Sequence, residues 1–298
     1  MTDTAPIELD RAFAAESLPV RDPASHKGSH GTLVCVCGSL EYAGAALLCA
    51  SAAARGGAGL VAMAVPRSLQ TVVAGRVPEV VTIGLPETAD SADVDARGAM
   101  EAIAGRTPDA LVIGPGLRET EGNRTLVVRL LASRGGPAVV DGGGLNLLAM
   151  SGEWWTGVAR RCVLTPHPGE YERLMREKAG TTDDERREAC RRAAERLRQV
   201  VVLKGAHTVI AQPDGRAAVA PFANAALATA GSGDVLAGLI GSLLAQGLEP
   251  FTAACLGTYI HGRAAERISD RLGDAGLLAS DLTQEIPLVR RELSEVRG

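Results

Sequence analysis

The chain has 298 residues, of which 46% are hydrophobic and 22% are charged, and its formal net charge is −4 at pH 7. This composition excludes a disordered chain, and the acidic balance argues against a nucleic-acid-binding protein, whose surface usually shows a basic excess. Only 3% of the residues are aromatic, so platforms on which bases stack are not expected either. A sizeable core must therefore be built from Ala, Val, Leu and Gly.

The N-terminal sequence MTDTAPIELDRAFAAES carries acids early and has no apolar run of signal-peptide length. No window of the chain reaches the ~18 uncharged apolar residues that would indicate a membrane span. The six cysteines are scattered without a CxxC pair, which favours reduced thiols over a zinc site or a disulfide framework. We therefore expect a soluble, cytoplasmic protein with no membrane partner.

Eight short apolar runs predict β-strands. They are rich in β-branched residues and mostly lack strict alternation, which is typical of strands that are buried on both faces of a parallel sheet. Each run ends at a Gly, a Pro or a polar residue. The predicted strands occupy residues 31–38, 60–65, 80–85, 110–116, 137–144, 162–167, 200–205 and 208–212.

Segments of helical length separate several of these runs, and after about residue 222 helices follow one another. Strand–helix alternation predicts a three-layer α/β/α sandwich with a central, mostly parallel sheet and right-handed crossovers. No linker splits the chain, so we expect a single domain over residues 1–298, with residues 1–28 as an N-terminal extension. The predicted helices occupy residues 42–55, 121–134, 183–199, 232–246, 250–271 and 277–295.

The carboxyl ends of the predicted strands are glycine-rich and polar, and in an open parallel sheet ligands bind beyond those ends. One such end leads into ATAGSGDVLAGLIGSLLAQG, residues 228–247. The free N–H groups of the helix start, approached through Gly231, Ser232 and Gly233, predict an anion cradle. Asp234 beside that cradle suits a general base for a hydroxyl that receives a phosphoryl group. The alternative is that Asp234 is a simple charge cap of the helix.

Two further strand ends carry candidate ligand groups. In LKGAHT, Lys204 could contact a phosphate and the backbone from Gly205 to Thr208 could line a nucleotide, although a Lys beside a turn glycine also fits. In LTPHPGE, His167 could contact a ligand and Glu170 could organise Mg²⁺ or water. A rigid turn followed by a helix with an acidic first turn explains the same residues structurally.

Taken in order, GSxxYxGA, GPGL, LTPHPGE, LKGAHT, ATAGSGDVLAG and the ending GLLASDLTQEIP resemble the ADP-dependent NAD(P)H-hydrate dehydratases of the ribokinase-like superfamily. The resemblance runs from about residue 31 to residue 287. It implies repair of hydrated NADH and NADPH, called NADHX and NADPHX, by dehydration of the S epimer while ADP becomes AMP and phosphate. The implied chemistry is phosphorylation of the ring hydroxyl followed by elimination of phosphate.

The resemblance also implies roles for particular residues. Asp234 would touch the substrate hydroxyl as general base, and Mg²⁺ and ADP would serve the reaction. The family is often homotetrameric, and we expect no epimerase domain here, so a separate NAD(P)HX epimerase would act alongside. By motif, NAD(P)HX would be contacted by Ala45, Gly116, His167 and Asp234, and the adenine nucleotide by Lys204, Gly205, Ala206, His207, Thr208 and Gly233.

Two other functions stay open from the sequence. A small-molecule alcohol kinase of the same superfamily would share GSGD and the anion cradle but release a stable phosphorylated product. A non-catalytic nucleotide-binding subunit would not need Asp234. In VVDGGGLN, Asp141 and Asn146 could bind a ligand or tie loops together.

Overall fold

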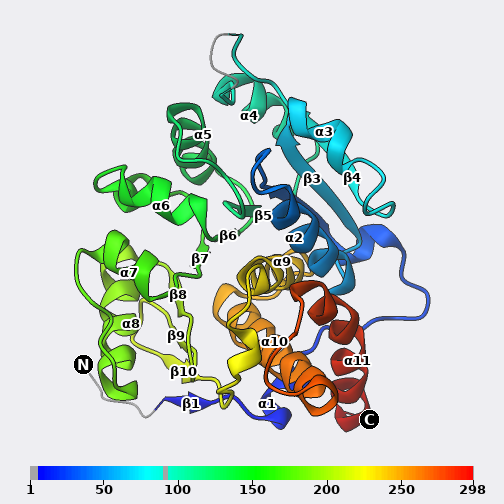
Figure 1. The fold of residues 1–298 in the computed structure, drawn as a ribbon, viewed down its shortest axis with the longest axis vertical. Coiled ribbons are helices and arrows are strands. Elements are labelled where there is room, and N and C mark those ends of the chain that lie inside the picture. The colour runs from blue at the N-terminus through cyan, green and yellow to red at the C-terminus, as the bar shows by residue number, and fades with distance from the viewer. Residues whose placement is uncertain (1–5, 90–92, 298) are drawn as a thin grey trace.

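The computed structural model describes residues 6–89 and 93–297. Within them, ten strands form one twisted sheet in the order β1-β10-β9-β8-β7-β6-β5-β2-β3-β4 (Figure 1). The strands are β1 Ile7–Glu8, β2 Thr32–Val36, β3 Leu60–Pro66, β4 Val81–Leu85, β5 Ala110–Ile113, β6 Ala138–Val140, β7 Cys162–Leu164, β8 Val200–Leu203, β9 Val209–Ala211 and β10 Ala217–Val219.

All strand pairs from β4 to β8 are parallel, whereas β8–β9 and β9–β10 are antiparallel. The mostly parallel sheet expected from the sequence is therefore confirmed. Several strands end earlier than predicted; β5 stops at Ile113 and β6 at Val140. The glycines that follow them form the loops at the carboxyl edge of the sheet.

Helices cover both faces of the sheet, which confirms the three-layer sandwich (Figure 1). One face carries α1 Arg11–Ser17, α2 Ala43–Arg55, α3 Arg67–Val73, α9 Ser232–Ala245, α10 Pro250–Leu272 and α11 Ala279–Arg297. The other face carries α4 Ala96–Ala104, α5 Glu121–Ala132, α6 Gly143–Ala149, α7 Pro168–Met175 and α8 Asp183–Leu197. Short 3₁₀ helices lie at Lys27–His30, Trp154–Gly157 and Ala225–Leu227.

Strand β2 shows how the sequence builds two cores from one strand. Leu33 and Cys35 point into the core beneath α2 and α9, while Val34 and Val36 point into the core on the opposite face. Successive side chains of a strand alternate between its faces, so a run without polar residues fills both cores. All six cysteines lie buried as free thiols within the described part of the chain, as expected.

The described part of the N-terminal extension belongs to the packed domain. Strand β1 pairs in parallel with β10 at the sheet edge, and α1 begins after Asp10, whose carboxylate accepts the N–H of Phe13. Leu9 and Ala14 are buried in the core of the α9 face. The sequence did not predict either element, nor the short strand β10.

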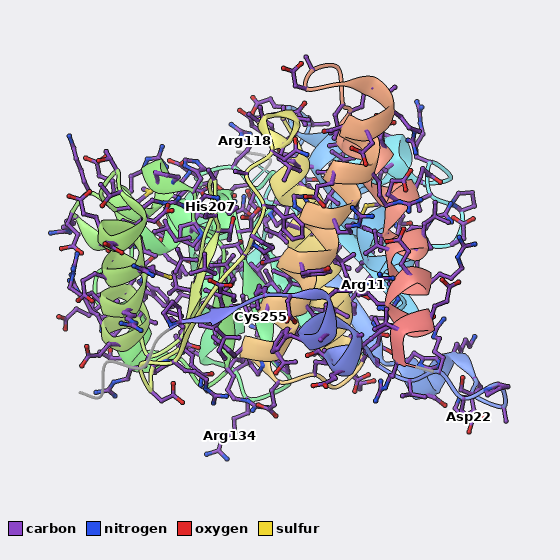
Figure 2. All side chains as sticks on the ribbon, turned by 90° about the horizontal axis from the view of Figure 1, so that it is seen from below. Arg11, Asp22, Arg118, Arg134, His207 and Cys255 are labelled. Atoms are coloured by element: carbon purple, nitrogen blue, oxygen red, sulfur yellow. The ribbon has the colours of Figure 1, made fainter. Side chains whose placement is uncertain are left out.

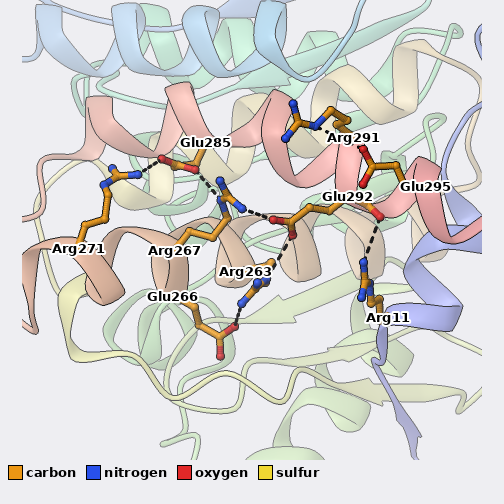
Figure 3. Close-up of polar contacts among 9 residues, drawn as sticks. All are labelled: Arg11, Arg263, Glu266, Arg267, Arg271, Glu285, Arg291, Glu292 and Glu295. Atoms are coloured by element: carbon orange, nitrogen blue, oxygen red, sulfur yellow. Dashed lines mark hydrogen bonds and ion pairs between the residues drawn. The ribbon is translucent and has the colours of Figure 1, made fainter.

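Helices α10 and α11 are joined by a network of arginines and glutamates (Figure 3). Glu285, which is 3% exposed, accepts from Arg267 at 2.7 Å and from Arg271 at 2.5 Å. Arg267 also pairs with Glu292, and Arg11 of α1 donates to the backbone carbonyl of Glu292. These contacts fix the outer helices against one another, and with them the position of α9 beneath.

Candidate active site

The strand order reverses between β2 and β5, because β2 leads through α2 to β3 on one side while β5 leads to β6 on the other. Such a switch point opens a crevice at the carboxyl ends of the two strands. Ala45 follows β2 in the first turn of α2, and Gly116 follows β5. A Cβ added at Gly116 would lie 2.9 Å from the Cβ of Ala45 and 2.9 Å from the carbonyl oxygen of Tyr42. The fold therefore brings these two predicted ligand contacts together.

Helix α9 begins at the same edge of the sheet. Gly231 is its N-cap, with φ +90°, a left-handed conformation that glycine adopts readily. The hydroxyl of Ser232 is turned away into the preceding loop, where it donates to the carbonyls of Leu227 and Thr229. The N–H of Ser232 donates to the Thr229 carbonyl at 3.4 Å, but Gly231 has no side chain to cap the helix, so the N–H groups of Gly233 and Asp234 are left for a ligand.

A buried ion-pair cluster lies beside this helix start. Lys204, which follows β8, donates from Nζ to Asp141 Oδ1 at 2.7 Å and lies 3.7 Å from Glu170 Oε2. The Thr165 hydroxyl donates to the same oxygen of Asp141 at 2.7 Å. A Cβ added at Gly233 would lie 3.2 Å from Lys204 Nζ, so the ammonium group stands directly over the first turn of α9.

The charges of this cluster act on Asp234. The pKa of Asp234 is raised to about 7, first by burial of its carboxyl and then by the carboxylates of Asp141 and Glu170, while the Lys204 ammonium opposes the rise. Burial alone would lower the pKa of Lys204, but Asp141 and Glu170 outweigh it and raise that pKa. The pKa of Asp234 therefore lies near neutral pH, where its carboxyl can both accept and release a proton. A simple charge cap would instead be held ionised.

The segment LTPHPGE forms the start of α7 through a reciprocal cap. His167 Nδ1 accepts the N–H groups of Gly169 at 3.0 Å and Glu170 at 3.3 Å, and Glu170 Oε2 accepts the N–H of His167 at 2.8 Å. The structural reading of this segment is thus correct. The capping role leaves His167 free for a further contact, because half of its side chain remains exposed at the carboxyl edge.

The loop from Lys204 to Thr208 joins β8 to β9 and is held from beneath by Arg186 of α8. The Arg186 guanidinium donates to the carbonyls of Leu203 and Lys204 at 3.3 Å and also to that of Ala206. His207 faces outward and pairs with Asp183 at 3.0 Å. The loop therefore has a fixed backbone with one lysine aimed at the cluster.

Several contributors to the site were not foreseen from the sequence. His261 of α10 contacts the Ser232 carbonyl through Nε2 at 3.0 Å, and burial lowers the pKa of His261 to about 4, so it is neutral. Thr165 and Arg186 also had no predicted role. Asn146 ties loops together, since its amide bonds to Glu119 and Arg173. The strand end before Asp141 was a usable signal, but nothing local marked His261.

A protein cage for Mg²⁺ does not fit these residues. Among residues 6–89 and 93–297, no group of three histidine, cysteine or carboxylate side chains could hold a metal ion. Glu170 is engaged with the His167 N–H and lies beside Lys204. In the same residues, no helix is long and apolar enough to cross a membrane.

Comparisons with known proteins identify the family of the chain. The sequence pattern of the NAD(P)H-hydrate dehydratase family matches residues 33–288. A bifunctional NAD(P)H-hydrate repair enzyme of Moorella thermoacetica is 42% identical over 96% of this chain and 54% of its own length. The chain spans about half the length of the first such relatives. An ADP-dependent (S)-NAD(P)H-hydrate dehydratase of Xanthomonas campestris is 34% identical over 93% of both chains.

A solved structure matches the whole fold. The ADP/ATP-dependent NAD(P)H-hydrate dehydratase of Bacillus subtilis, co-crystallised with ATP and Mg²⁺, superimposes with a TM-score of 0.83 and 30% identity. The match covers 98% of this chain and 100% of the other. The ribokinase-like fold expected from the sequence is thereby confirmed.

Proposed function

The chain belongs to the NAD(P)H-hydrate dehydratase family, and we propose that it dehydrates the S epimer of NADHX and NADPHX to NADH and NADPH at the expense of ADP. The observation that carries the proposal is the half-buried Asp234 carboxyl, with a pKa of about 7, beside the Lys204 ammonium at the start of α9. A general base works best when its pKa lies near the working pH.

The proposed reaction has two steps. In the first, the ring hydroxyl gives its proton to Asp234, its oxygen forms a bond to the β-phosphorus of ADP, and the bond between that phosphorus and the bridging oxygen breaks, releasing AMP. In the second, the carbon–oxygen bond of the phosphorylated ring breaks, the adjacent ring carbon loses a proton, and inorganic phosphate leaves as the double bond re-forms. Asp234 is therefore the catalytic residue.

The phosphoryl group would lie between Lys204 and the start of α9. The helix start at Gly231, Ser232 and Gly233 would offer its partial positive charge to the phosphoryl group, and Lys204 would add a full charge. The Arg186-braced loop, with Gly205, Ala206, His207 and Thr208, would line the rest of the adenine nucleotide. An anion in this position would compete with Asp141 for the Lys204 ammonium and so weaken that ion pair.

The hydrated dinucleotide would enter at the switch point between β2 and β5. Ala45 and Gly116 offer little side-chain bulk there, so the ligand could approach the backbone closely. His167 stands at the start of α7 with half of its side chain exposed and Nε2 3.5 Å from Glu170 Oε1, and in the proposal its exposed ring contacts the ligand. Asp234 would then face the ring hydroxyl from beneath.

Mg²⁺ would enter with the nucleotide, held by phosphate oxygens and water, since Mg²⁺ usually keeps several waters. Any contact with Glu170 would run through water. The proposal further includes a homotetrameric assembly and a separate epimerase that supplies the S epimer.

The test is recovery of NADH absorbance. The protein is incubated with (S)-NADHX, Mg²⁺ and either ADP or ATP, and the NADH band is followed together with AMP and phosphate release. We expect recovery that requires nucleotide, with one AMP formed per NADH when ADP is supplied. A nucleotide-free sample measures spontaneous recovery.

Two outcomes would contradict the proposal. Absence of recovery with both nucleotides would remove the dehydratase function. Accumulation of a stable phosphorylated alcohol without NADH would indicate the small-molecule kinase instead.

A further inference from the structure

A cavity of about 400 Å³ lies at the amino edge of the sheet, at the end of the strands away from the candidate active site. Its walls come from the residues that precede and begin β7 and β8, from the turn after β9, and from the first turn of α10. This volume is within the range of small-molecule sites. None of its residues has a part in the proposed dehydration.

The lining of this cavity is cationic in a chain whose net charge is −4. Arg161, Arg198 and Arg216 line it together with a single acid, Glu249, which pairs with Arg161. Arg216 pairs with Asp214 outside the cavity at 3.4 Å. Arg198 forms no ion pair with the residues that the structure describes. The cavity thus offers more positive charge than its own acids neutralise.

A buried amide adds an unused donor. Gln199 is 8% exposed, and its Oε1 accepts the N–H of Cys162 at 2.6 Å. Its Nε2 has no hydrogen-bond partner within the described parts of the chain, and the side chain lines the cavity. Since Nε2 is not one of the fully buried atoms that lack a partner, it is accessible from the cavity, where water or a ligand can accept from it.

The start of α10 contributes further N–H groups to the same cavity. Phe251 and Thr252 belong to its first turn, whose N–H groups have no acceptor inside the helix. Glu249 at the N-cap makes no side-chain bond to them within the described residues. Arginines, an amide and helix N–H groups together suit a phosphate, which accepts many hydrogen bonds.

The cavity also has an apolar part. The ring of Phe251 is 6% exposed, and the Arg216 guanidinium lies over it at 5.4 Å from the ring centre. Val200 and Pro213 continue this wall. A ligand that filled the cavity would therefore join an anionic group to an apolar or planar body.

We propose that this cavity, built by Arg198, Gln199, Arg216 and the start of α10, binds a small phosphomonoester with a planar or apolar body. The phosphate lies among Arg198, the Gln199 amide and the first turn of α10, and the planar body lies along Phe251 and Arg216. The site is independent of the proposed dehydration.

The test is isothermal titration calorimetry of the full chain with phenyl phosphate, with inorganic phosphate and phenol as separate arms. We expect phenyl phosphate to bind more tightly than inorganic phosphate and phenol to give no binding heat. Each of Arg198→Gln and Arg216→Gln should weaken phenyl phosphate binding about tenfold, since the first removes a charge-assisted hydrogen bond to the phosphate and the second removes the cation beside the planar body. Both arginines are at the surface, and thermal melts would check that the variants fold.

Two further variants locate the binding. Arg134→Gln removes an exposed arginine at the same edge but outside the cavity, and it should leave the affinity unchanged (Figure 2). Lys204→Met removes the cation of the candidate active site, so it should weaken any phenyl phosphate binding there while it leaves binding in the cavity unchanged. Loss of binding in Lys204→Met with retention in Arg198→Gln would overturn the proposal, and so would absence of phenyl phosphate binding to the wild-type chain.

Discussion

The two edges of the sheet each present the start of a long helix next to cationic side chains, but they differ in what surrounds the charge. Figure 2 shows Arg118 and His207 toward one edge and Arg134 at the opposite edge. At the carboxyl edge, α9 starts beside Lys204 and buried carboxyl groups. At the amino edge, α10 starts beside arginines that are largely exposed.

The difference separates binding from catalysis. Helix N–H groups and a cation suffice to hold an anion at either edge. At the carboxyl edge the half-buried carboxyl of Asp234 lies among other carboxylates, so a base with a pKa of about 7 faces the anion site there. The arginines of the amino edge are strong donors but cannot act as bases.

The largest expected effect is on turnover in Asp234→Asn. Removing the base should lower the rate of NADHX dehydration ~100-fold or more while nucleotide affinity stays close to wild type. Rates and ADP affinity would be measured side by side, with Arg198→Gln as the control from the other edge. Near-normal turnover in Asp234→Asn would mean that the carboxyl edge has no catalytic base and differs from the amino edge only in its ligands.

The same variant makes a prediction about stability. The folded protein holds the Asp234 proton up to about pH 7, whereas the unfolded chain releases it near pH 4, so ionisation costs the wild-type protein stability as pH rises between them. Asp234→Asn should therefore be more stable than wild type above pH 7, with the gain vanishing below about pH 4. Thermal melts across this range would show it, and a destabilised variant at high pH would indicate a charge cap.

A second comparison uses one glycine from each edge. Gly116 has φ +69° and Gly152 has φ +61°, so an alanine is similarly strained at both. At Gly116 the new Cβ would lie 2.9 Å from Tyr42 and Ala45, whereas at Gly152 no atom lies within 4 Å among the described residues. Gly116→Ala should cost about 1–3 kcal/mol more unfolding free energy than Gly152→Ala. Urea unfolding measures both, and equal costs would mean that the switch point can relax.

The smallest expected effect is a shift in the pH dependence of turnover. The Asp141 carboxylate raises the pKa of Asp234, so Asp141→Asn should lower that pKa and move the acid limb of the turnover profile below its wild-type position near pH 7. Thr165→Val removes a hydrogen bond to Asp141 without changing charge, and its limb should stay in place. An unmoved limb in Asp141→Asn would mean that Asp141 does not act electrostatically on the base.

The strands and the loops at their carboxyl ends were predictable because each has a recognisable local sequence pattern. A strand buried on both faces reads as an apolar run, and the loop after it needs glycine and polar residues. Strands β1 and β10 were missed because two or three residues adopt strand geometry only through their pairing with each other and with β9. The short helices α1, α3, α4 and α6 were missed because their apolar pattern is too brief to separate from loops.

The sequence by itself determined the fold class, the family resemblance and the candidates Lys204 and Asp234, because those depend on local composition and motif order. Only the tertiary structure decided that Asp141, Glu170 and Lys204 surround Asp234, that His261 supports Ser232, and that arginines from separate connecting segments share one cavity. Each of these features depends on groups that are distant in the chain and meet in a buried or half-buried place. The pKa of a carboxyl is set by that space, so no local pattern could state it.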